Sequence, residues 1–214
     1  MARPASSVTV VQYGRHRGAQ RTRLDATAWV EAGTQILVRQ SIDQVGVERL
    51  AKVLGVTKGS FYWHFKNKAE LQGAILDRWT RKSTLEVQER LQREQAKPED
   101  RLFRLLELPF WSPRAARAAD LELAIRAWSR RSVLARRAVQ KVDTIRVEFL
   151  IEIFAELGFD AAEGSSRSHL AYAFMRYLSQ LRDVDEATQR QMIGVAFGCV
   201  TAPAKSRSRK PSRS

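Results

Sequence analysis

The sequence predicts an all-α protein of about nine helices. Strand signals are nearly absent, because the chain has no sustained alternation of apolar and polar residues and no Asn-Gly or Asp-Gly hairpin turn. Apolar residues recur instead at the three-to-four-residue spacing of helices. The chain has 214 residues, of which 44% are hydrophobic, so it is long enough to bury a sizeable core.

Capping residues and prolines predict where the helices begin. The first helix is expected at about residues 21–38. Asn67 is a good N-cap for a long helix over 68–95, whose apolar residues step by four and form one buried stripe. Pro98 and Pro113 favour the starts of further helices, because proline is tolerated in the first turn. The remaining helices are expected at about 99–110, 113–130, 132–157, 160–181 and 185–200.

The positive charge of the chain is concentrated at its ends. The formal net charge is +14, but residues 1–23 contain five basic residues and residues 201–214 another five, with no acidic residue in either segment. Such segments raise the affinity for polyanions without shaping a fold. We expect disordered basic arms at 1–20 and 201–214, an N-terminal domain over 21–67 and a larger helical domain over 68–200.

Residues 47–65 have the spacing of a helix-turn-helix, in which two short helices cross at a steep angle. Ala51 supplies the small residue where the second helix crosses the first. Gly55, four positions later, tolerates the positive φ of the turn, and Val56 fills the gap between the helices. Thr57 is expected to cap the second helix. Because such a motif places its second helix in the major groove, it predicts a DNA-binding protein.

The apolar residues of this segment allow a second interpretation. Leu50, Leu54, Phe61 and Phe65 are expected to close a small core with the first helix. A buried helical hairpin with a glycine turn would also use aromatic residues in this way. The agreement of the alanine, glycine, valine, capping, aromatic and lysine positions favours DNA binding.

The residues that an enzyme would need are missing from the sequence. His16, His64 and His169 lie far apart, and none has a partner at metal-ligand spacing. No G-x-S-x-G elbow, Walker loop or G-x-G-x-x-G motif occurs, so we expect no catalytic residue, no metal and no cofactor. Cys199 is the only cysteine and is expected to be a small buried hydrophobe. No apolar run approaches the roughly 18–20 residues that span a bilayer, and no signal peptide follows Met1, so we expect a cytoplasmic protein without membrane contact.

Residues 60–68, Ser-Phe-Tyr-Trp-His-Phe-Lys-Asn-Lys, and the following Ala-Glu-Leu resemble the recognition-helix signature of TetR-family transcription regulators. The resemblance extends back to the first helix, and beyond residue 95 it is one of architecture only. It implies a homodimer that presents two recognition helices to a palindromic operator in double-stranded DNA. It also implies a repressor that releases the operator when a small-molecule effector binds in the C-terminal helical bundle.

The resemblance assigns DNA contacts residue by residue. The residues nearest the bases would be Thr57, Lys58, Gly59 and Ser60. The residues that hold phosphates would be Tyr62, His64, Lys66 and Lys68, while Trp63 would mostly pack against the protein. The basic N-terminal arm departs from the family pattern, and Arg21, which directly follows it, is a candidate for a contact in the minor groove. Whether either basic arm contacts DNA stays open.

The resemblance also implies an effector pocket and a dimer interface. The candidate pocket residues, each of which could equally be ordinary core, are Phe103, Phe110, Trp111, Trp128, Phe149 and Tyr172. Four arginines, Arg114, Arg117, Arg126 and Arg176, suggest an acidic ligand, although a solvated helix face explains them as well. The last two helices are expected to form the dimer interface through Ala171, Phe174, Met175, Leu178, Met192, Ile193, Ala196 and Phe197.

Two alternatives to this function remain at the level of sequence. The same helix-turn-helix would serve a low-specificity or architectural DNA-binding protein without effector control, and it would serve an activator as well as a repressor. The sequence identifies neither the operator nor the effector.

Overall fold

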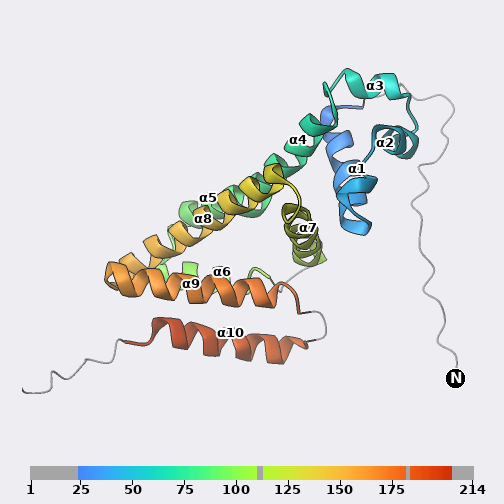
Figure 1. The fold of residues 1–214 in the computed structure, drawn as a ribbon. Helices are drawn as coiled ribbons and strands as arrows, with labels where there is room; N and C mark the ends of the chain where they lie inside the picture. The colour runs from blue at the N-terminus through green and yellow to red at the C-terminus, as the bar shows by residue number, and fades with distance from the viewer. Residues whose placement is uncertain (1–23, 110–112, 182–183, 204–214) are drawn as a thin grey trace, which may run out of the picture.

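The computed structural model describes residues 24–109, 113–181 and 184–203, and these residues are all-α, as the sequence predicts (Figure 1). The helices are α1 (Ala26–Arg39), α2 (Val47–Leu54), α3 (Lys58–Tyr62), α4 (Lys68–Thr80), α5 (Glu86–Arg93), α6 (Pro98–Glu107), α7 (Pro113–Ser129), α8 (Val133–Glu156), α9 (Ala161–Leu178) and α10 (Glu186–Thr201), with a 3₁₀ turn, η1 (Ile42–Gln44), and a π-helical turn, η2 (Arg81–Leu85). If α4, η2 and α5 count as one long helix, the described part of the chain has nine α-helices. Arg21 and the expected arm at 1–20 lie outside the described residues, as does the expected arm at 201–214 beyond residue 203.

Side-chain caps fix the starts of several helices. Asn67 Oδ1 accepts a hydrogen bond from the N–H of Glu70 at 3.0 Å, and Glu70 Oε2 accepts one from the N–H of Lys66 at 2.6 Å. The pair satisfies the N–H of Glu70, in the first turn of α4, and the N–H of Lys66, just before the helix. Asp160 and Asp185 cap α9 and α10 through their side chains. The predicted starts of these three helices are therefore confirmed to within a residue or two.

Helices α1, α2 and α3 form a small N-terminal module, residues 24–67. Trp29 of α1, Leu50 of α2 and Phe61 of α3 are completely buried in its core. Gly33 allows α4 to approach α1 closely, because an added Cβ would lie 2.9 Å from Cδ1 of Ile75. The start of α4 is thereby fixed to the module that precedes it.

The core of the N-terminal module continues into the C-terminal helices. Trp79 of α4, Trp128 of α7 and Val139 of α8 belong to the same buried cluster as Trp29. Trp128 was a candidate pocket residue, but it is a buried core residue that joins α7 to the module. The two predicted domains thus share one hydrophobic core at their boundary.

The long helix that connects the module to the bundle is not a regular α-helix. It runs from α3 along α8 (Figure 1), and the π-helical turn η2 interrupts it at Arg81–Leu85. It also ends at Arg93, two residues earlier than predicted, and Gln95 has a φ of 46°. Because π-helical turns are rare and often occur at functional sites, η2 is a candidate part of a functional site.

None of the described helices combines the length and the apolar character that crossing a bilayer requires. Within the described ranges, no group of three or more His, Cys, Asp or Glu residues is arranged to hold a metal ion.

Candidate functional site

The turn between α2 and α3 has the geometry of a helix-turn-helix. Gly55 adopts φ 67° and ψ 31°, which is the left-handed conformation that the sequence requires of it. The N–H of Val56 donates to the carbonyl of Ala51 at 3.0 Å and so closes the end of α2. Thr57 is the N-cap residue of α3, but its side chain makes no capping hydrogen bond, which corrects the predicted cap. The backbone carbonyl of Thr57 instead accepts from the N–H of Ser60 at 3.1 Å.

Aromatic packing holds α3 in place. The ring of Phe61 meets that of Trp29 edge to face, with a centroid separation of 5.4 Å and an interplanar angle of 77°. Phe65 is also buried, and its ring centroid lies 5.5 Å from that of Phe61. A helix of five residues is too short to be stable alone, so these contacts determine its orientation.

The other side of α3 and the turn after it form an exposed surface at one end of the molecule (Figure 1). All the predicted DNA-contacting residues from 57 to 68 reach this surface. The exposed ones are Thr57, Lys58, Gly59, Tyr62, Lys66 and Lys68, whereas Ser60 and His64 are half-buried. Trp63 was expected to pack against the protein, but it is 79% exposed, so the structure adds a large aromatic side chain to this surface.

An acidic residue restrains one of the predicted base-contacting side chains. Lys58 Nζ lies 2.7 Å from Glu48 Oε1, and both side chains are exposed. The hydrogen bond from Lys58 and its positive charge lower the pKa of Glu48. A contact of Lys58 with DNA would compete with this ion pair.

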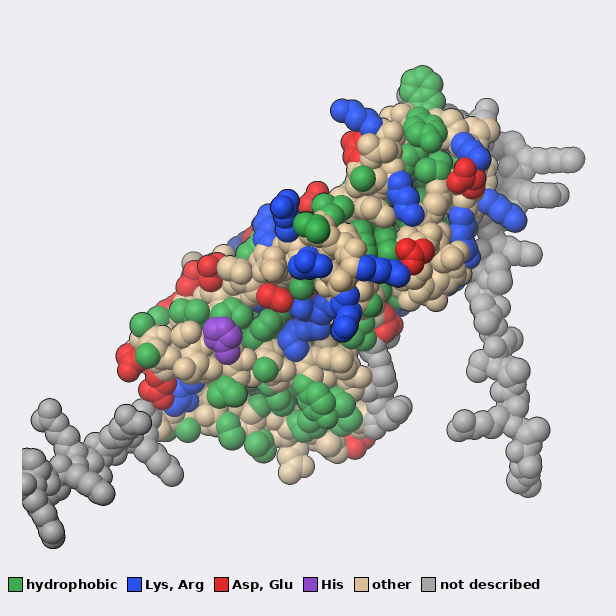
Figure 2. Space-filling model, viewed as in Figure 1, with side chains coloured by type: hydrophobic (Ala, Val, Ile, Leu, Met, Phe, Trp, Pro, Cys, Tyr) green, Lys and Arg blue, Asp and Glu red, His purple; other side chains and the backbone are tan. Residues whose placement is uncertain are grey.

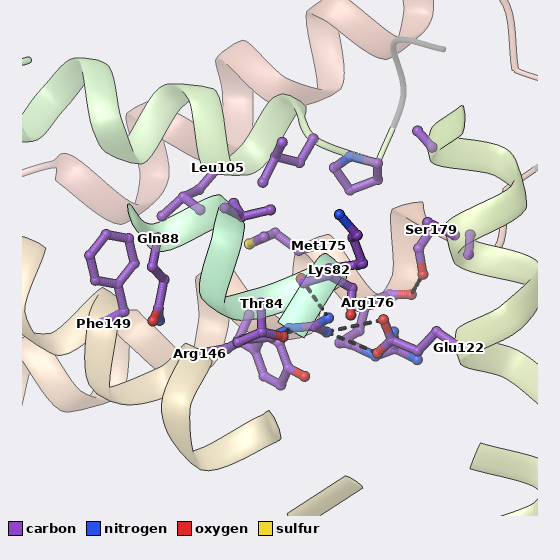
Figure 3. A pocket seen from close by; sticks show the side chains of 18 of the residues that line it. Lys82, Thr84, Gln88, Leu105, Glu122, Arg146, Phe149, Met175, Arg176 and Ser179 are labelled. Atoms are coloured by element: carbon purple, nitrogen blue, oxygen red, sulfur yellow. Dashed lines mark hydrogen bonds and ion pairs between the residues drawn. The ribbon is translucent and has the colours of Figure 1, made fainter. Parts of the chain in front are cut away.

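A cavity of about 450 Å³ lies in the C-terminal helices (Figure 3). Its walls come from the η2–α5 segment, α6, α7, α8 and α9. Apolar side chains such as Leu105 and Phe149 lie on one side, and Glu122, Arg146 and Arg176 lie on the other (Figure 3). The volume falls within the usual range for small-molecule sites.

The structure brings two of the six predicted pocket residues to this cavity, Phe149 and Tyr172. Phe103 lies outside it and packs against Phe197 at a centroid separation of 5.5 Å. Trp128 belongs to the core described above. Phe110 and Trp111 lie outside the described residues.

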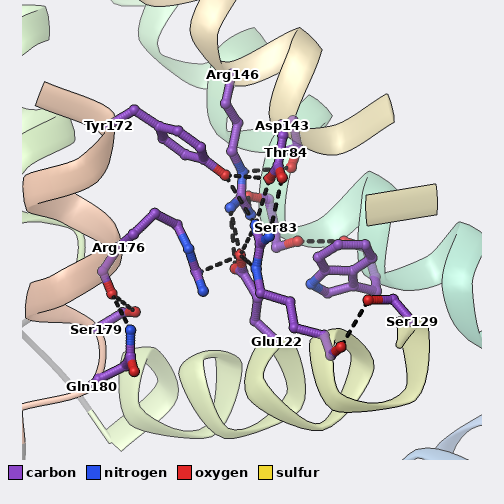
Figure 4. A network of polar contacts seen from close by, with 12 residues as sticks. Ser83, Thr84, Glu122, Ser129, Asp143, Arg146, Tyr172, Arg176, Ser179 and Gln180 are labelled. Carbon is purple, nitrogen blue, oxygen red and sulfur yellow. Dashed lines mark hydrogen bonds and ion pairs between the residues drawn. The ribbon is translucent and has the colours of Figure 1, made fainter. Parts of the chain in front are cut away.

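A group of six polar side chains forms the charged side of the cavity and the layer behind it (Figure 4). We call this group the arginine cluster; its members are Glu122, Arg126, Asp143, Arg146, Tyr172 and Arg176. Arg126 forms a bidentate ion pair with Asp143, with N–O distances of 2.5 and 3.0 Å. Arg146 and Arg176 both donate to Glu122 Oε1, at 2.9 and 2.5 Å.

Burial and charge act in opposite directions on the ionisable groups of the arginine cluster. Burial raises the pKa of Glu122, but the positive charges of Arg146 and Arg176 outweigh it, so the pKa lies below its ordinary value. The pKa of Asp143 is lowered likewise, since the hydrogen bonds from Arg126 and Tyr172 outweigh its burial. Both carboxyl groups are therefore ionised at neutral pH.

Sequence reasoning found only part of this cluster. Arg126 and Arg176 were among the four arginines that suggested an acidic ligand, whereas Arg117 is exposed and the side chain of Arg114 is outside the description. Glu122, Asp143 and Arg146 were missed. The spacing of Glu122 and Arg126, four residues apart on one helix, was a signal for an ion pair but not for its burial.

Three of the eight predicted dimer residues lie in the interior of the subunit. Ala171, Leu178 and Ile193 are buried within the single chain and cannot contact a second one. The remaining five, Phe174, Met175, Met192, Ala196 and Phe197, are only half-buried.

A different apolar surface is exposed on α9 and α10, where hydrophobic side chains gather over α10 (Figure 2). We call this surface the outer face. It contains Leu170, Ala173, Tyr177, Gly194, Val195, Gly198 and Cys199, all exposed. Cys199 is therefore not the buried hydrophobe that the sequence suggested.

Comparisons with known proteins agree with this geometry. Residues 30–75 match the family model described as "Bacterial regulatory proteins, tetR family". A 59-residue segment is 39% identical to the HTH-type transcriptional regulator TtgR of Pseudomonas putida, and this match covers 28% of the chain and 27% of TtgR. The chain thus matches only about a quarter of the length of that relative.

Solved structures resemble the chain over most of its length. A transcriptional regulator from Rhodococcus sp. Rha1 gives a TM-score of 0.68 at 17% identity, covering 83% of this chain and 96% of that one. AibR, solved in complex with isovaleryl coenzyme A and operator DNA, gives 0.59 at 17% identity, covering 83% and 98%. At such identities the likeness establishes the fold.

The left-handed turn and the exposed α3 define a helix-turn-helix DNA-binding protein. The matched sequence then identifies the family of this domain: residues 30–75 are a DNA-binding domain of the tetR family of bacterial regulatory proteins. TtgR and the Rhodococcus protein are named as transcriptional regulators and not as enzymes.

Proposed function

We propose that the protein is a homodimeric, ligand-responsive repressor that binds a palindromic operator through α3 and releases it when a small molecule enters the cavity. The observation that carries this proposal is the position of two sites on one long helix. Lys68, at the start of α4, belongs to the exposed DNA-binding surface, and η2 and α5 form one wall of the cavity. Coupling between a DNA site and an effector site requires a shared element of this kind.

In the proposed complex, α3 lies in the major groove. Thr57, Lys58, Gly59 and Ser60 lie nearest the bases, and Tyr62, His64, Lys66 and Lys68 hold the phosphates on either side. Gly59 is exposed and has no side chain, so the backbone of α3 can approach the DNA closely at this position. The solved complex of AibR with operator DNA supports this use of the fold.

Replacing Glu48 by glutamine is expected to strengthen DNA binding a few-fold at low salt. The change removes a negative charge beside the proposed DNA-binding surface and releases Lys58 from its ion pair. Fluorescence anisotropy with an operator duplex at several salt concentrations would measure the effect. Glu31→Gln is the matched control, because Glu31 forms a similar exposed ion pair with Arg78; equal effects of the two changes would contradict the role given to Lys58.

The outer face is the proposed dimer interface. Leu170 and Tyr177 of α9 and Val195 of α10 are 63%, 58% and 61% exposed, which is unusual for such large apolar side chains gathered on one surface. Two copies related by a twofold axis would cover the face with itself and place two α3 helices on one side of the dimer.

Val195→Arg is expected to convert the dimer to a monomer, because the twofold axis places the new charge in the interface twice. Light scattering coupled to size-exclusion chromatography would measure the mass in solution. Val133→Arg is a matched control, since Val133 is 59% exposed at the start of α8 and lies away from the outer face. A Val195→Arg protein that stays dimeric would exclude the outer face as the interface.

The proposed coupling passes through Arg146. Its Nε donates to Thr84 Oγ1 and its Nη2 to the carbonyl of Ser83, both at 3.1 Å, while its Nη1 donates to Glu122 at 2.9 Å. Arg146 therefore ties the π-helical turn to the charged side of the cavity. A ligand that replaces one of these hydrogen-bond partners of Arg146 changes the contacts that position η2. Because η2 continues into α4, the change alters the position of α3.

Selection of binding sites from random DNA with the purified full-length protein tests the proposed function. We expect one palindromic sequence to be enriched and to bind about 10³-fold or more tightly than unrelated duplexes. Its half-sites should be separated by about one helical turn or a multiple of it. Similar affinity for every duplex would favour the low-specificity DNA-binding protein instead.

A further inference from the structure

The charges of the arginine cluster do not balance, and this imbalance bears on the kind of ligand that the cavity accepts. The cluster contains three guanidinium groups, on Arg126, Arg146 and Arg176, and two carboxylates, on Glu122 and Asp143. Tyr172 adds no charge, because burial and its hydrogen bond to Asp143 raise the pKa of its hydroxyl. Among the residues that the structure describes, one positive charge in this half-buried site is therefore left without a matching carboxylate.

Two of the three arginines are fully engaged with the protein. Arg126 pairs with both oxygens of Asp143 and also donates to Glu122. Arg146 donates to Ser83, Thr84 and Glu122, and it uses Nε and both terminal nitrogens to do so. The protein itself therefore supplies hydrogen-bond acceptors to the guanidinium groups of both Arg126 and Arg146.

Arg176 is the arginine with spare donors. Its hydrogen bond within the described residues joins Nη1 to Glu122 Oε1, an oxygen that already accepts from Arg126 and Arg146. Burial, together with the neighbouring charges of Arg126 and Arg146, lowers the pKa of Arg176. Its side chain lines the cavity (Figure 3), so its remaining N–H groups can meet a ligand there.

The rest of the cavity is suited to an apolar group. Leu105 and Leu108 of the α6 segment, Phe149 and Leu150 of α8, and Met175 of α9 line it. Three further charged residues line the cavity: Lys82 and Arg90, which are exposed to solvent, and Glu86, whose Oε2 lies 3.1 Å from Lys82 Nζ. Together they give the exposed edge of the cavity one net positive charge. A positive edge of this kind attracts anions.

We propose that the cavity binds a small amphipathic carboxylate, whose anionic group pairs with Arg176 and whose apolar part lies against Leu105, Phe149 and Met175. The inference rests on the effector role proposed above and names the chemical class of the effector. A single carboxylate supplies the missing negative charge, and planar guanidinium groups pair well with carboxylates. A cationic ligand would add a fourth positive charge to the cluster, and a neutral one would leave the imbalance in place.

Calorimetric titration of the full-length protein with matched probes tests the proposal. The probes are hexanoate, octanoate and 4-phenylbutyrate, each compared with its primary amide, together with octylamine as the cation. At least one carboxylate should bind about 10-fold or more tightly than its amide, as expected for a charge-assisted pair. The proposal is overturned if no carboxylate exceeds its amide, or if octylamine binds as tightly as octanoate.

Two variants assign the effect to Arg176. Arg176→Gln should lower the affinity for the best carboxylate about 10-fold or more and leave the affinity for its amide unchanged, whereas Arg176→Lys should retain part of the preference. Arg117→Gln is the control, because Arg117 is exposed on α7 and does not line the cavity. Equal losses for carboxylate and amide in Arg176→Gln would show a structural role only and would overturn the assignment.

Measurements of operator binding distinguish a failure of this inference from a failure of the proposed function. Operator binding is measured without any probe, for the wild type and for Arg176→Gln, and then with the best carboxylate added. Selective carboxylate binding without an enriched operator would leave the inference standing and overturn the regulator. An enriched operator without a carboxylate preference would overturn the inference and leave the proposed regulator standing.

Discussion

Replacing Glu122 by alanine is expected to lower the free energy of unfolding by about 3–5 kcal/mol, the usual cost of removing one partner of a buried ion pair. The Glu122 carboxylate accepts from Arg126, Arg146 and Arg176 and is almost completely buried. Without it, three positive charges face one another with only Asp143 to balance them. Chemical denaturation followed by circular dichroism would measure the loss.

The same substitution should change the acid sensitivity of the protein. The folded pKa of Glu122 lies below its ordinary value of 4.5, so its ionised form stabilises the fold above that pH. This contribution is lost as the pH falls through the lower folded pKa, and Glu122→Ala should remove it. Glu89→Ala is the control, because Glu89 forms an exposed ion pair with Arg93 and should cost less than about 1 kcal/mol. Equal losses for the two variants would contradict the role of the arginine cluster.

Phe61→Ala is expected to abolish specific DNA binding and to cost about 3–5 kcal/mol of stability, as for other buried phenylalanines. The ring of Phe61 is completely buried and meets Trp29, and α3 has only five residues. Without the ring, α3 loses the orientation that places its exposed side in the groove. Operator binding by anisotropy and unfolding by denaturant would be measured on the same preparation.

Tyr62→Ala is the matched control for Phe61→Ala, because it removes the neighbouring aromatic ring from the exposed side of α3. It should leave the stability within about 0.5 kcal/mol and weaken DNA binding through one lost contact. Normal operator affinity in Phe61→Ala would mean that α3 does not depend on this packing.

Most of the DNA-binding module could be predicted because its determinants are local. The spacing of Ala51, Gly55 and Val56 fixes a turn through one backbone conformation, and neighbours within five residues provide the hydrogen bonds. The cap at Asn67 is local in the same sense. The prediction that Trp63 packs against the protein was wrong. The family pattern marks the position only as aromatic, and aromatic side chains occur both in cores and on binding surfaces.

The cavity could not be predicted in the same way, because its charged side is assembled from distant parts of the chain. Arg126 and Asp143 are 17 residues apart, and Glu122 and Arg176 are 54 apart. Helical periodicity also failed on α9 and α10, where apolar residues occupy both sides of each helix. Leu170 and Ala171 are neighbours, yet one is exposed and the other buried, and composition alone does not distinguish them.

The π-helical turn η2 determines the angular phase between the two halves of the long helix. Trp79 and Leu91 are both buried, but they are separated by twelve positions, which places them about 120° apart around a regular α-helix. A π-helical turn accommodates one extra residue, and this brings the two side chains to within about 20° of each other. Straightening η2 into α-helix would therefore turn the N-terminal module by about 100° about the helix axis. The two recognition helices of the proposed dimer would then no longer face the same side of a duplex.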